Sequence, residues 1–213
     1  LRGEGANAPL VQDLASYERY FKTRMAPWEH VAFAKCAAWA GDEEFAQSFL
    51  EILASVIRAP VTRERFDALA TTRFQLETLV HDSALAFETK RSPGGRYDIE
   101  YLSAMGLAHS GAEYPLDANT SERLEILAEA GVISADEWRA LAGAFTFFTQ
   151  VDFLLELQGF SRPSNAEKAR KIERYLDRSL ELLGIRVVNG VIAALAESKS
   201  SVRAISTRSL TDL

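Results

Sequence analysis

The pattern of hydrophobic and polar positions along the chain predicts helices almost throughout. Apolar residues recur at spacings of three and four, as they do on the buried face of an amphipathic helix. All six prolines fall between such stretches, and an interior proline would break a helix. Sustained alternation of period two, which is typical of strands, is missing except at residues 10–11 and 186–188. The sequence therefore predicts an all-α fold, an antiparallel, bundle-like domain of about eight or nine helices.

Capping residues indicate where several of these helices begin. Thr62 is a plausible cap with an incomplete capping box, and Ser134 with Glu137 has the signature of a complete one. Asn119 and Asn165 mark two further helix starts, and Asp42 opens a first turn rich in acids, where the helix dipole favours them. The extent of the last helix is left open by Gly190 and a serine-rich cluster. The predicted helices cover residues 14–21, 28–35, 42–57, 62–88, 99–111, 119–131, 134–155, 165–183 and 187–210.

Composition and charge exclude several classes of protein. The 213 residues are 47% hydrophobic and 25% charged, which is ordinary for a globular chain and excludes disorder. The net charge of −6 disfavours a nucleic-acid-binding domain, because that binding rests on clustered positive charge. A single cysteine, Cys36, excludes an internal disulfide and fits a reducing cytoplasm. The chain starts without a signal-peptide pattern, and no apolar run predicts a membrane span.

Residue types with catalytic or metal-binding chemistry are scattered. The three histidines share no ligand spacing with each other or with Cys36, so we expect no metal site and histidines that are either exposed or hydrogen-bonded. Cys36 lies among alanines and is interpreted as a small buried hydrophobe rather than a nucleophile. The tryptophans are predicted to lie in the core. These residues are His30, His81, His109, Trp28, Trp39 and Trp138.

One stretch is unusual, KRSPGGRYDIEY at residues 90–101. Gly94 and Gly95 give backbone freedom just before a predicted helix start, where unpaired N–H groups favour anions. Lys90, Arg91 and Arg96 add positive charge to an otherwise acidic chain. The same residues also fit a tight turn between helices with Asp98 as the cap of the second helix. Both interpretations stay open at this level.

This stretch resembles the K-x-G-x-G-G-x-R-D-I-E-F signature of bacterial glutamine synthetase adenylyltransferases and, more loosely, of PII uridylyltransferases. WEHVAFAKCAAWAGD at residues 28–42 is similar to W-E-x-x-A-L-x-K-A-R-x-V-A-G-D of the same family. Residues 119–134 resemble its N-T-x-x-A-L-x-x-L-x-x-x-G-L-L-S motif, and residues 1–14 resemble its L-R-P-x-G…L-V-x-S-L stretch. The similarity is collinear from residue 1 to about residue 160.

The resemblance implies a two-part enzyme. A nucleotidyltransferase head would carry a G-G-S-D-x-D motif and a third Asp that bind magnesium and ATP, for adenylyl transfer to a tyrosine of glutamine synthetase or its removal. This chain lacks G-G-S-D-x-D, so it is expected to hold no cofactor and to be inactive alone. Residues 1–40 would be the tail of the head and residues 41–213 the helical domain. The implied partners are the attached head, glutamine synthetase and the PII protein, in the cytoplasm, with no membrane or nucleic acid.

By position, the resemblance brings six residues near the nucleotide or substrate: Arg2, Lys90, Gly94, Gly95, Asp98 and Glu100. Arg2 and Lys90 would face phosphate, the glycines would give close-approach backbone, and the two acids would organise the loop. None of the six is expected to be a catalytic residue or a metal ligand. The chain also departs from the family. Tyr97 stands in place of an arginine, Ala37 replaces the arginine of K-A-R, and residues 147–155 lose the basic and histidine residues of F-L-R-R-x-E-H-R-L.

These departures leave an alternative of a different class, a non-catalytic helical module that docks a protein partner or regulates an attached domain. A third possibility, nucleic-acid binding by the face from Lys168 to Arg178, is disfavoured. Acidic residues on the same helix, Glu167, Glu173, Asp177 and Glu181, predict a solvated surface of mixed charge.

Overall fold

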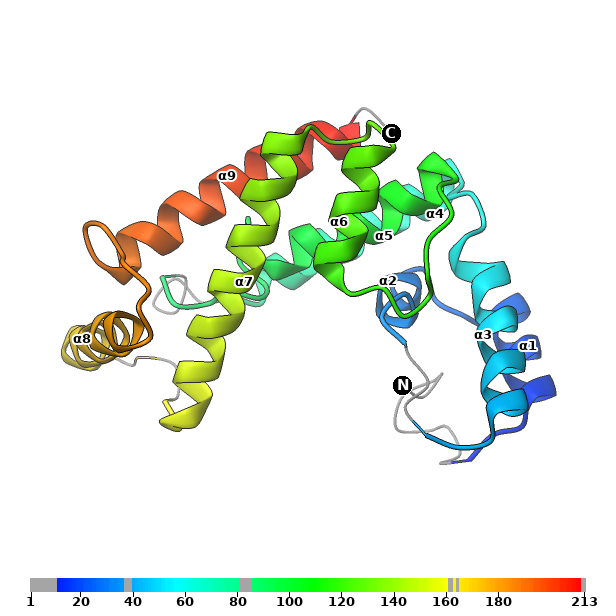
Figure 1. Ribbon diagram of the computed structural model, residues 1–213, viewed down its shortest axis with the longest axis horizontal. Helices are drawn as coiled ribbons and strands as arrows, with labels where there is room; N and C mark the ends of the chain where they lie inside the picture. The colour runs from blue at the N-terminus through cyan, green and yellow to red at the C-terminus, as the bar shows by residue number, and fades with distance from the viewer. Residues whose placement is uncertain (1–10, 37–39, 81–85, 161–162, 164, 212–213) are drawn as a thin grey trace. The chain divides into compact units, whose positions relative to one another are not determined.

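The computed structural model describes residues 11–36, 40–80, 86–160, 163 and 165–211, and within these ranges it contains nine helices and no strand (Figure 1). The all-α prediction and the number of helices are confirmed. The helices are α1 (Leu14–Thr23), α2 (Glu29–Phe33), α3 (Glu43–Ile57), α4 (Arg63–Thr78), α5 (Arg96–Ser110), α6 (Thr120–Glu129), α7 (Ala135–Leu157), α8 (Ala166–Leu182) and α9 (Val191–Thr211).

The chain divides into two compact units. Unit 1 comprises residues 1–72 and 100–134, and unit 2 comprises residues 73–99 and 135–212, with Leu213 grouped with unit 1. Helices α4 and α5 each contribute residues to both units. The family resemblance implies a different boundary, at residue 40 between the nucleotidyltransferase head and the helical domain. These two units do not test that boundary, so it stays a prediction.

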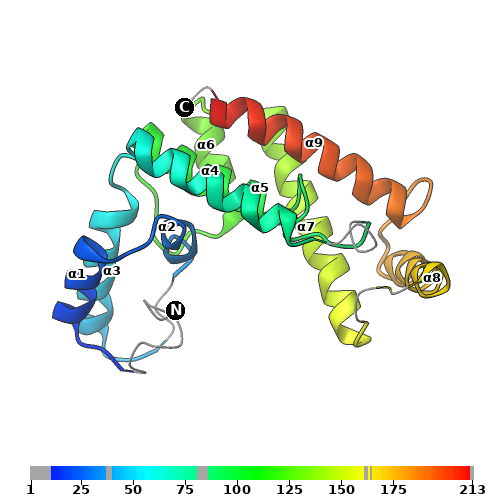
Figure 2. The same ribbon diagram turned by 180° about the vertical axis from the view of Figure 1, so that it is seen from behind.

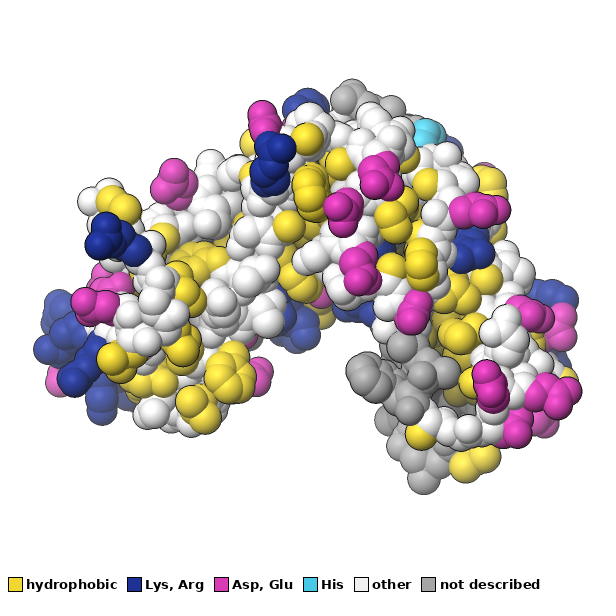
Figure 3. Space-filling view, viewed as in Figure 1, with side chains coloured by type: hydrophobic (Ala, Val, Ile, Leu, Met, Phe, Trp, Pro, Cys, Tyr) yellow, Lys and Arg dark blue, Asp and Glu magenta, His cyan; other side chains and the backbone are white. Residues whose placement is uncertain are grey.

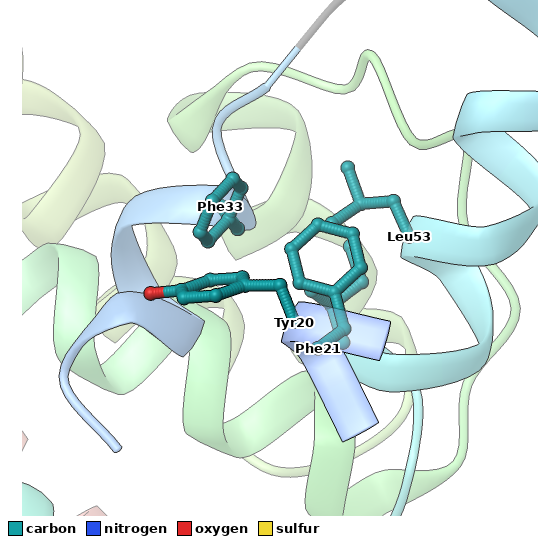
Figure 4. Packing of buried hydrophobic residues seen from close by; sticks show 5 residues of the cluster. Tyr20, Phe21, Phe33 and Leu53 are labelled. Atoms are coloured by element: carbon teal, nitrogen blue, oxygen red, sulfur yellow. The ribbon is translucent and has the colours of Figure 1, made fainter. Parts of the chain in front are cut away.

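Aromatic residues form the core of unit 1 where α1, α2 and α3 pack. Figure 4 shows Tyr20 and Phe21 from α1 lying beside Phe33 of α2 and Leu53 of α3. The Phe21 and Phe33 rings meet edge to face, with their centroids 4.9 Å apart. Phe33 and Leu53 are almost completely buried, and a buried side chain of this size stabilises the fold by about 1.5–3 kcal/mol. Leu53 and Ile57 of α3 are four residues apart and both belong to this cluster, as the three-and-four spacing predicts.

Helix α6 has a start that depends on local chemistry alone. The Asn119 side chain accepts the N–H groups of Ser121 and Glu122, and the Glu122 carboxylate accepts the N–H of Asn119, which completes a capping box. At the other end of the helix, Gly131 follows the C-cap Ala130 and has a φ of 75°, a value that glycine adopts without strain. The predicted start and the predicted stop of this helix are both confirmed. Asp42 and Asn165 are the caps of α3 and α8, where each side chain accepts a backbone N–H of the first turn.

Unit 2 is built on α7, α8 and α9, which pack on one another in pairs (Figure 1). Leu141, Phe148 and Val151 form the buried stripe of α7. Helix α8 contributes Ile172, Leu176 and Leu180, and α9 contributes Val191, Leu195 and Val202. In the view from behind, the loop that precedes α5 lies beside α9 (Figure 2). This loop carries most of the residues singled out by the sequence.

The structure differs from the sequence prediction at two helix boundaries near the candidate site, and it fixes the extent of the last helix, which the sequence left open. The helix predicted over residues 62–88 ends at Thr78, and residues 86–88 form a turn and extended chain. Helix α5 begins at Arg96, so Asp98 is its third residue rather than its cap. The serine-rich cluster lies inside α9, because its serines are spaced between buried apolar residues that pack on the rest of unit 2.

The tryptophan prediction is wrong for Trp28, which is 46% exposed, while Trp138 is half-buried and Trp39 lies outside the described residues. One described helix, α7, is long and apolar enough to cross a membrane by length and composition, contrary to the sequence expectation. Its buried stripe packs on α8 and α9, and Asp152 within it is paired with Arg96. A core helix passes the same test of length and composition.

Candidate functional site

The candidate site is the segment of residues 88–95, which we call the glycine loop. Its first turn is held by Glu88, whose Oε1 accepts the N–H groups of Lys90 and Arg91 at 3.1 and 3.0 Å. The Ser92 hydroxyl donates to the carbonyl oxygen of Glu88. The loop therefore closes on itself before α5 begins.

The two glycines face protein backbone. Gly94 has a φ of 73°, and a Cβ atom added to it would overlap with the carbonyl oxygen of Lys199 in α9. A Cβ on Gly95 would lie 2.7 Å from the carbonyl oxygen of Thr89 and 2.9 Å from that of Ser92. The close approach that the sequence predicted at these glycines is made to α9 and to the loop itself. Whether a nucleotide also comes near them stays a prediction.

The backbone N–H groups at the start of α5 already have partners. Gly94 donates to Asp98 Oδ2 at 2.7 Å, and Gly95 donates to the Ser92 carbonyl at 2.8 Å. The N–H groups of Arg96 and Tyr97 donate to carbonyl oxygens of the loop at 2.7 and 3.0 Å. The expectation of unpaired N–H groups that would favour an anion is therefore wrong here, because the loop folds back and satisfies them. An anion near this loop would have to be held by side chains.

Asp98 joins the loop to α4. Its Oδ1 accepts a hydrogen bond from Arg73 Nε at 2.6 Å, and the Asp98 side chain is 3% exposed. The Arg73 guanidinium also donates to the carbonyl oxygens of Arg91 and Ser92, at 3.0 and 2.9 Å. Arg73 thus ties the middle of the loop to the first turn of α5, through charge-assisted bonds from one planar guanidinium. Asp98 thus holds the loop through Arg73 and the Gly94 N–H, and its place near a nucleotide or substrate, which the resemblance implies, stays a prediction.

A second arginine, Arg203 of α9, closes this cluster. Its Nη1 donates to Asp98 Oδ2 at 3.1 Å and to Glu77 Oε1 at 2.8 Å. Glu77 in turn lies 3.3 Å from Arg73. Two cations and two carboxylates therefore alternate in one network, which we call the Asp98 network. It links α4, the glycine loop, α5 and α9 within unit 2.

A second polar cluster lies at the start of the loop, around Asp152 of α7. The Thr89 hydroxyl donates to Asp152 Oδ1, and Arg96 lies 2.5 Å from Asp152 Oδ2. Burial raises the pKa of Asp152 and outweighs the hydrogen bond from Thr89 and the charge of Arg96. Burial also lowers the pKa of Lys199 to about 8, although the charges of Glu88 and Asp152 oppose that shift. The Lys199 amine donates to the Ala86 carbonyl at 3.2 Å.

The remaining predicted residues have other surroundings. Lys90 is exposed, and its amine lies 5.4 Å from the centroid of the Tyr97 ring, which suits a cation–π contact. Glu100 is buried and pairs with Lys35 at 2.7 Å in unit 1. Arg2 lies outside the described residues. Among the predicted charged residues that the structure describes, Lys90 is the one whose charge is open to solvent.

In the part of the chain that the structure describes, no three His, Cys, Asp or Glu residues are grouped so that they could hold a metal ion. Burial raises the pKa of the Cys36 thiol, which opposes a role as nucleophile. His109 is exposed, and His81 lies outside the described residues. His30 contradicts the expectation of an exposed or hydrogen-bonded histidine. It is fully buried, and no described residue bonds either ring nitrogen.

Comparison with known proteins gives one consistent result. Residues 1–52 match the model of the glutamate-ammonia ligase adenylyltransferase family. A bifunctional glutamine synthetase adenylyltransferase/adenylyl-removing enzyme of Mycobacterium avium is 37% identical over 158 residues, which are 70% of this chain and 16% of that protein. The enzyme of the same name from Streptomyces coelicolor is 28% identical over 209 residues, 95% of this chain and 20% of the relative.

The chain belongs to the glutamine synthetase adenylyltransferase family. It spans between about a sixth and a fifth of the length of these curated relatives. The resemblance drawn from the motifs is therefore confirmed.

Two positions that match the family signatures meet in unit 1. Lys35 corresponds to the lysine of K-A-R, and Glu100 corresponds to the glutamate of D-I-E-F. Their ion pair joins the chain just after α2 to α5. Another ion pair in unit 2 joins the glycine-loop signature to the altered segment at residues 147–155. Arg96, one position before the family's arginine, pairs with Asp152, which stands where the family has a glutamate.

The close approach of Gly94 to α9 gives a stability prediction. We expect Gly94→Ala to lower the free energy of unfolding by about 3 kcal/mol, because the new methyl group overlaps with backbone and the φ of 73° is strained for alanine. Gly159→Ala is the matched control, since Gly159 has a φ of 63° but no atom within 4 Å of an added Cβ. We expect it to cost about 1 kcal/mol, for the strain alone. Equal urea midpoints for the two variants would contradict the packing argument.

Proposed function

We propose that this chain is the helical part of an enzyme that transfers an adenylyl group from ATP to a tyrosine of glutamine synthetase, or removes it. The observation that carries the proposal is the similarity to bifunctional adenylyltransferases over most of the chain, including 95% of it in one relative. The Asp98 network supports it, because the signature residue Asp98 holds the signature loop in one conformation. Relatives with this name are bacterial, and we place the enzyme in the cytoplasm.

The role of this segment in that reaction is to position groups rather than to do the chemistry. The described residues offer no cluster of carboxylates for magnesium, so they do not fit that ion. We place ATP and magnesium in an attached nucleotidyltransferase head and assign no step through them to these residues. Lys90 is held on a loop fixed by buried bonds, and its exposed amine can attract an anionic group of nucleotide or substrate. The PII protein is the proposed regulatory partner.

Lys90 provides the test of this function. In the complete encoded protein, we expect Lys90→Ala to lower the rate of adenylyl transfer to glutamine synthetase by about tenfold, since an electrostatic contact of about 1.4 kcal/mol is lost. Thermal stability should be unchanged, because the side chain is exposed. Transfer is measured with radiolabelled ATP.

Lys22→Ala is the control, since it removes an exposed lysine whose described ion pair is a weak helical one with Glu18. We expect it to transfer at the rate of the unchanged protein. Equal rates for both variants and the unchanged protein would remove Lys90 from the site. Absence of any transfer by the unchanged protein would overturn the proposed function itself.

The second candidate function is a module that docks a protein partner without taking part in catalysis. The observation in its favour is that the backbone donors before α5 are already used within the loop. If Lys90→Ala changed binding of glutamine synthetase but left the rate at saturating glutamine synthetase unaltered, this second function would be preferred.

A further inference from the structure

The outer face of α8 carries five exposed cations. Arg170, Arg174 and Arg178 follow one another at intervals of four residues and so form one row along the helix. Lys168 and Lys171 are exposed beside this row. None of the five forms an ion pair with a residue that the structure describes. We call these five residues the α8 cation row, and Figure 3 shows Lys and Arg side chains gathered over this helix.

The acidic residues in the middle of α8 do not neutralise this row. Asp177 Oδ1 accepts the N–H of Val191, the first residue of α9, at 2.7 Å. A Cβ added to Gly190 would lie 3.9 Å from Glu173 Oε1, so this carboxylate is also at the start of α9. Carboxylates are stabilised there by free N–H groups and by the helix dipole. Two of the four acids of α8 are therefore turned toward α9. Glu167 and Glu181 are exposed on the side of the arginines, so this side keeps a mixed charge with an excess of cations.

Apolar residues continue the row at its end. Leu182 follows Arg178 by four residues and is 79% exposed, and Leu183 is 59% exposed. From Arg170 to Leu182 the row covers about 18 Å, at 1.5 Å per residue. A pocket opens at the same end of the helix, with Glu181, Gly184, Ile185 and Val187 in its lining. Cations beside exposed leucines and a pocket are the composition of a protein interface, with an apolar contact and a charged margin.

We propose that the α8 cation row and the adjacent Leu182 and Leu183 dock an acidic surface of a protein partner. The identification of that partner as the protein substrate, glutamine synthetase, rests on the proposed function. Nucleic acid fits less well, because a chain of net charge −6 repels a polyanion at long range and the exposed leucines would have no apolar contact. Insertion into a lipid surface fits less well too, because the apolar face of α8 (Ile172, Leu176 and Leu180) is already buried.

Neutralising the row tests the proposal in the complete encoded protein. Arg170→Gln, Arg174→Gln and Arg178→Gln are combined in one variant, which should fold because all three side chains are exposed. Binding to purified glutamine synthetase without ATP is measured by surface plasmon resonance at about 50 and 300 mM NaCl. We expect about tenfold weaker binding at low salt and a smaller loss of affinity on raising the salt, because fewer charges meet across the interface. The KM for glutamine synthetase should rise by the same factor, with kcat unchanged.

A matched variant controls for net charge. Lys22→Gln, Arg63→Gln and Arg139→Gln remove three exposed cations from α1, α4 and α7, so the total charge changes equally. We expect this variant to bind glutamine synthetase as the unchanged protein does. An equal loss of affinity in both triple variants would overturn the proposal, because net charge alone would then explain the effect.

The outcomes separate this proposal from the proposed function. Adenylyl transfer with the same KM in the α8 variant overturns docking by α8 and leaves the proposed function intact. If the unchanged protein neither binds nor modifies glutamine synthetase, the proposed function fails. Docking by α8 is then tested by measuring the affinity of a fluorescent helical peptide that has glutamates on one face and leucines at one end. Equal affinity of this peptide for the unchanged protein and the α8 variant overturns the proposal, as does an α8-dependent shift of duplex DNA or RNA without peptide binding.

Discussion

Asp98→Ala should lower the free energy of unfolding by about 4 kcal/mol, the loss typical of removing one partner of a buried ion pair. The substitution leaves the Arg73 guanidinium buried without its bond to Oδ1 and leaves the Gly94 N–H without an acceptor. It also removes one of the two carboxylates that Arg203 contacts. Denaturation with urea measures the loss, and hydrogen exchange at the Gly94 amide should show it locally, because that amide would lose protection.

Asp136→Ala is the control for this prediction. Asp136 is also paired with an arginine in unit 2, at 2.5 Å from Arg139, but its side chain is 93% exposed. Removing such a pair costs at most about 0.5 kcal/mol, because solvent screens it. A double variant with Arg203→Ala then tests the network, since residues that share a partner give non-additive effects. Equal stability of the two single aspartate variants would show that burial of Asp98 does not hold the loop.

The helices that the sequence predicted best are those whose ends depend on nearby residues. The cap of α6 needs Asn119 and Glu122, which are three residues apart, and both are visible in the sequence. The long helix predicted over residues 62–88 was wrong beyond Thr78 because its apolar spacing continued through Val80 and Phe87. Those two residues are buried without being helical, so periodicity alone could not separate a helix from a packed loop.

The candidate site was found in the sequence by its glycines, but its supporting residues were not. Arg73 and Glu77 stand at positions where the helical spacing calls for apolar residues, and that is the signal that could have marked them as a buried pair. Arg203 and Lys199 gave no such signal. They contact the loop across more than 100 residues of chain, and only the packing of α9 brings them there. A resemblance to the family identified the loop without showing what holds it.

A similar limit applied to α8. The sequence shows acids and bases alternating along this helix and therefore predicts a solvated surface of mixed charge. Exposed Glu167 and Glu181 agree with that prediction, but Asp177 departs from it, because α9 begins beside α8 and presents free N–H groups to this carboxylate. That contact depends on the connection through Gly184 and Gly190, both of which have positive φ. The charge that a helix presents to solvent thus depends on which of its charged residues bond to a neighbouring helix.

Acidification should destabilise unit 1 through His30, by up to about 5 kcal/mol between pH 6.5 and pH 3. Burial of the imidazole, together with the nearby charge of Arg65, lowers the pKa of His30 to about 3. In that pH range the unfolded chain binds a proton at this histidine that the folded protein does not bind. The free energy of unfolding therefore falls as the pH falls below 6.5, by about 1.4 kcal/mol for each pH unit, and the loss ends near pH 3.

Replacing the histidine should remove this dependence. His30→Leu keeps an apolar side chain in a site where no described residue bonds either ring nitrogen, so we expect stability at pH 7 to be unchanged or about 1 kcal/mol higher. At pH 5 the variant should exceed the unchanged protein by about 2 kcal/mol more than it does at pH 7. Urea denaturation at pH 7, 6 and 5 measures both differences. His109→Leu is the control, because His109 is exposed and is therefore solvated in both the folded and the unfolded protein. We expect this variant to lose stability on acidification as the unchanged protein does. An unaltered pH dependence in His30→Leu would show that other groups cause the acid destabilisation.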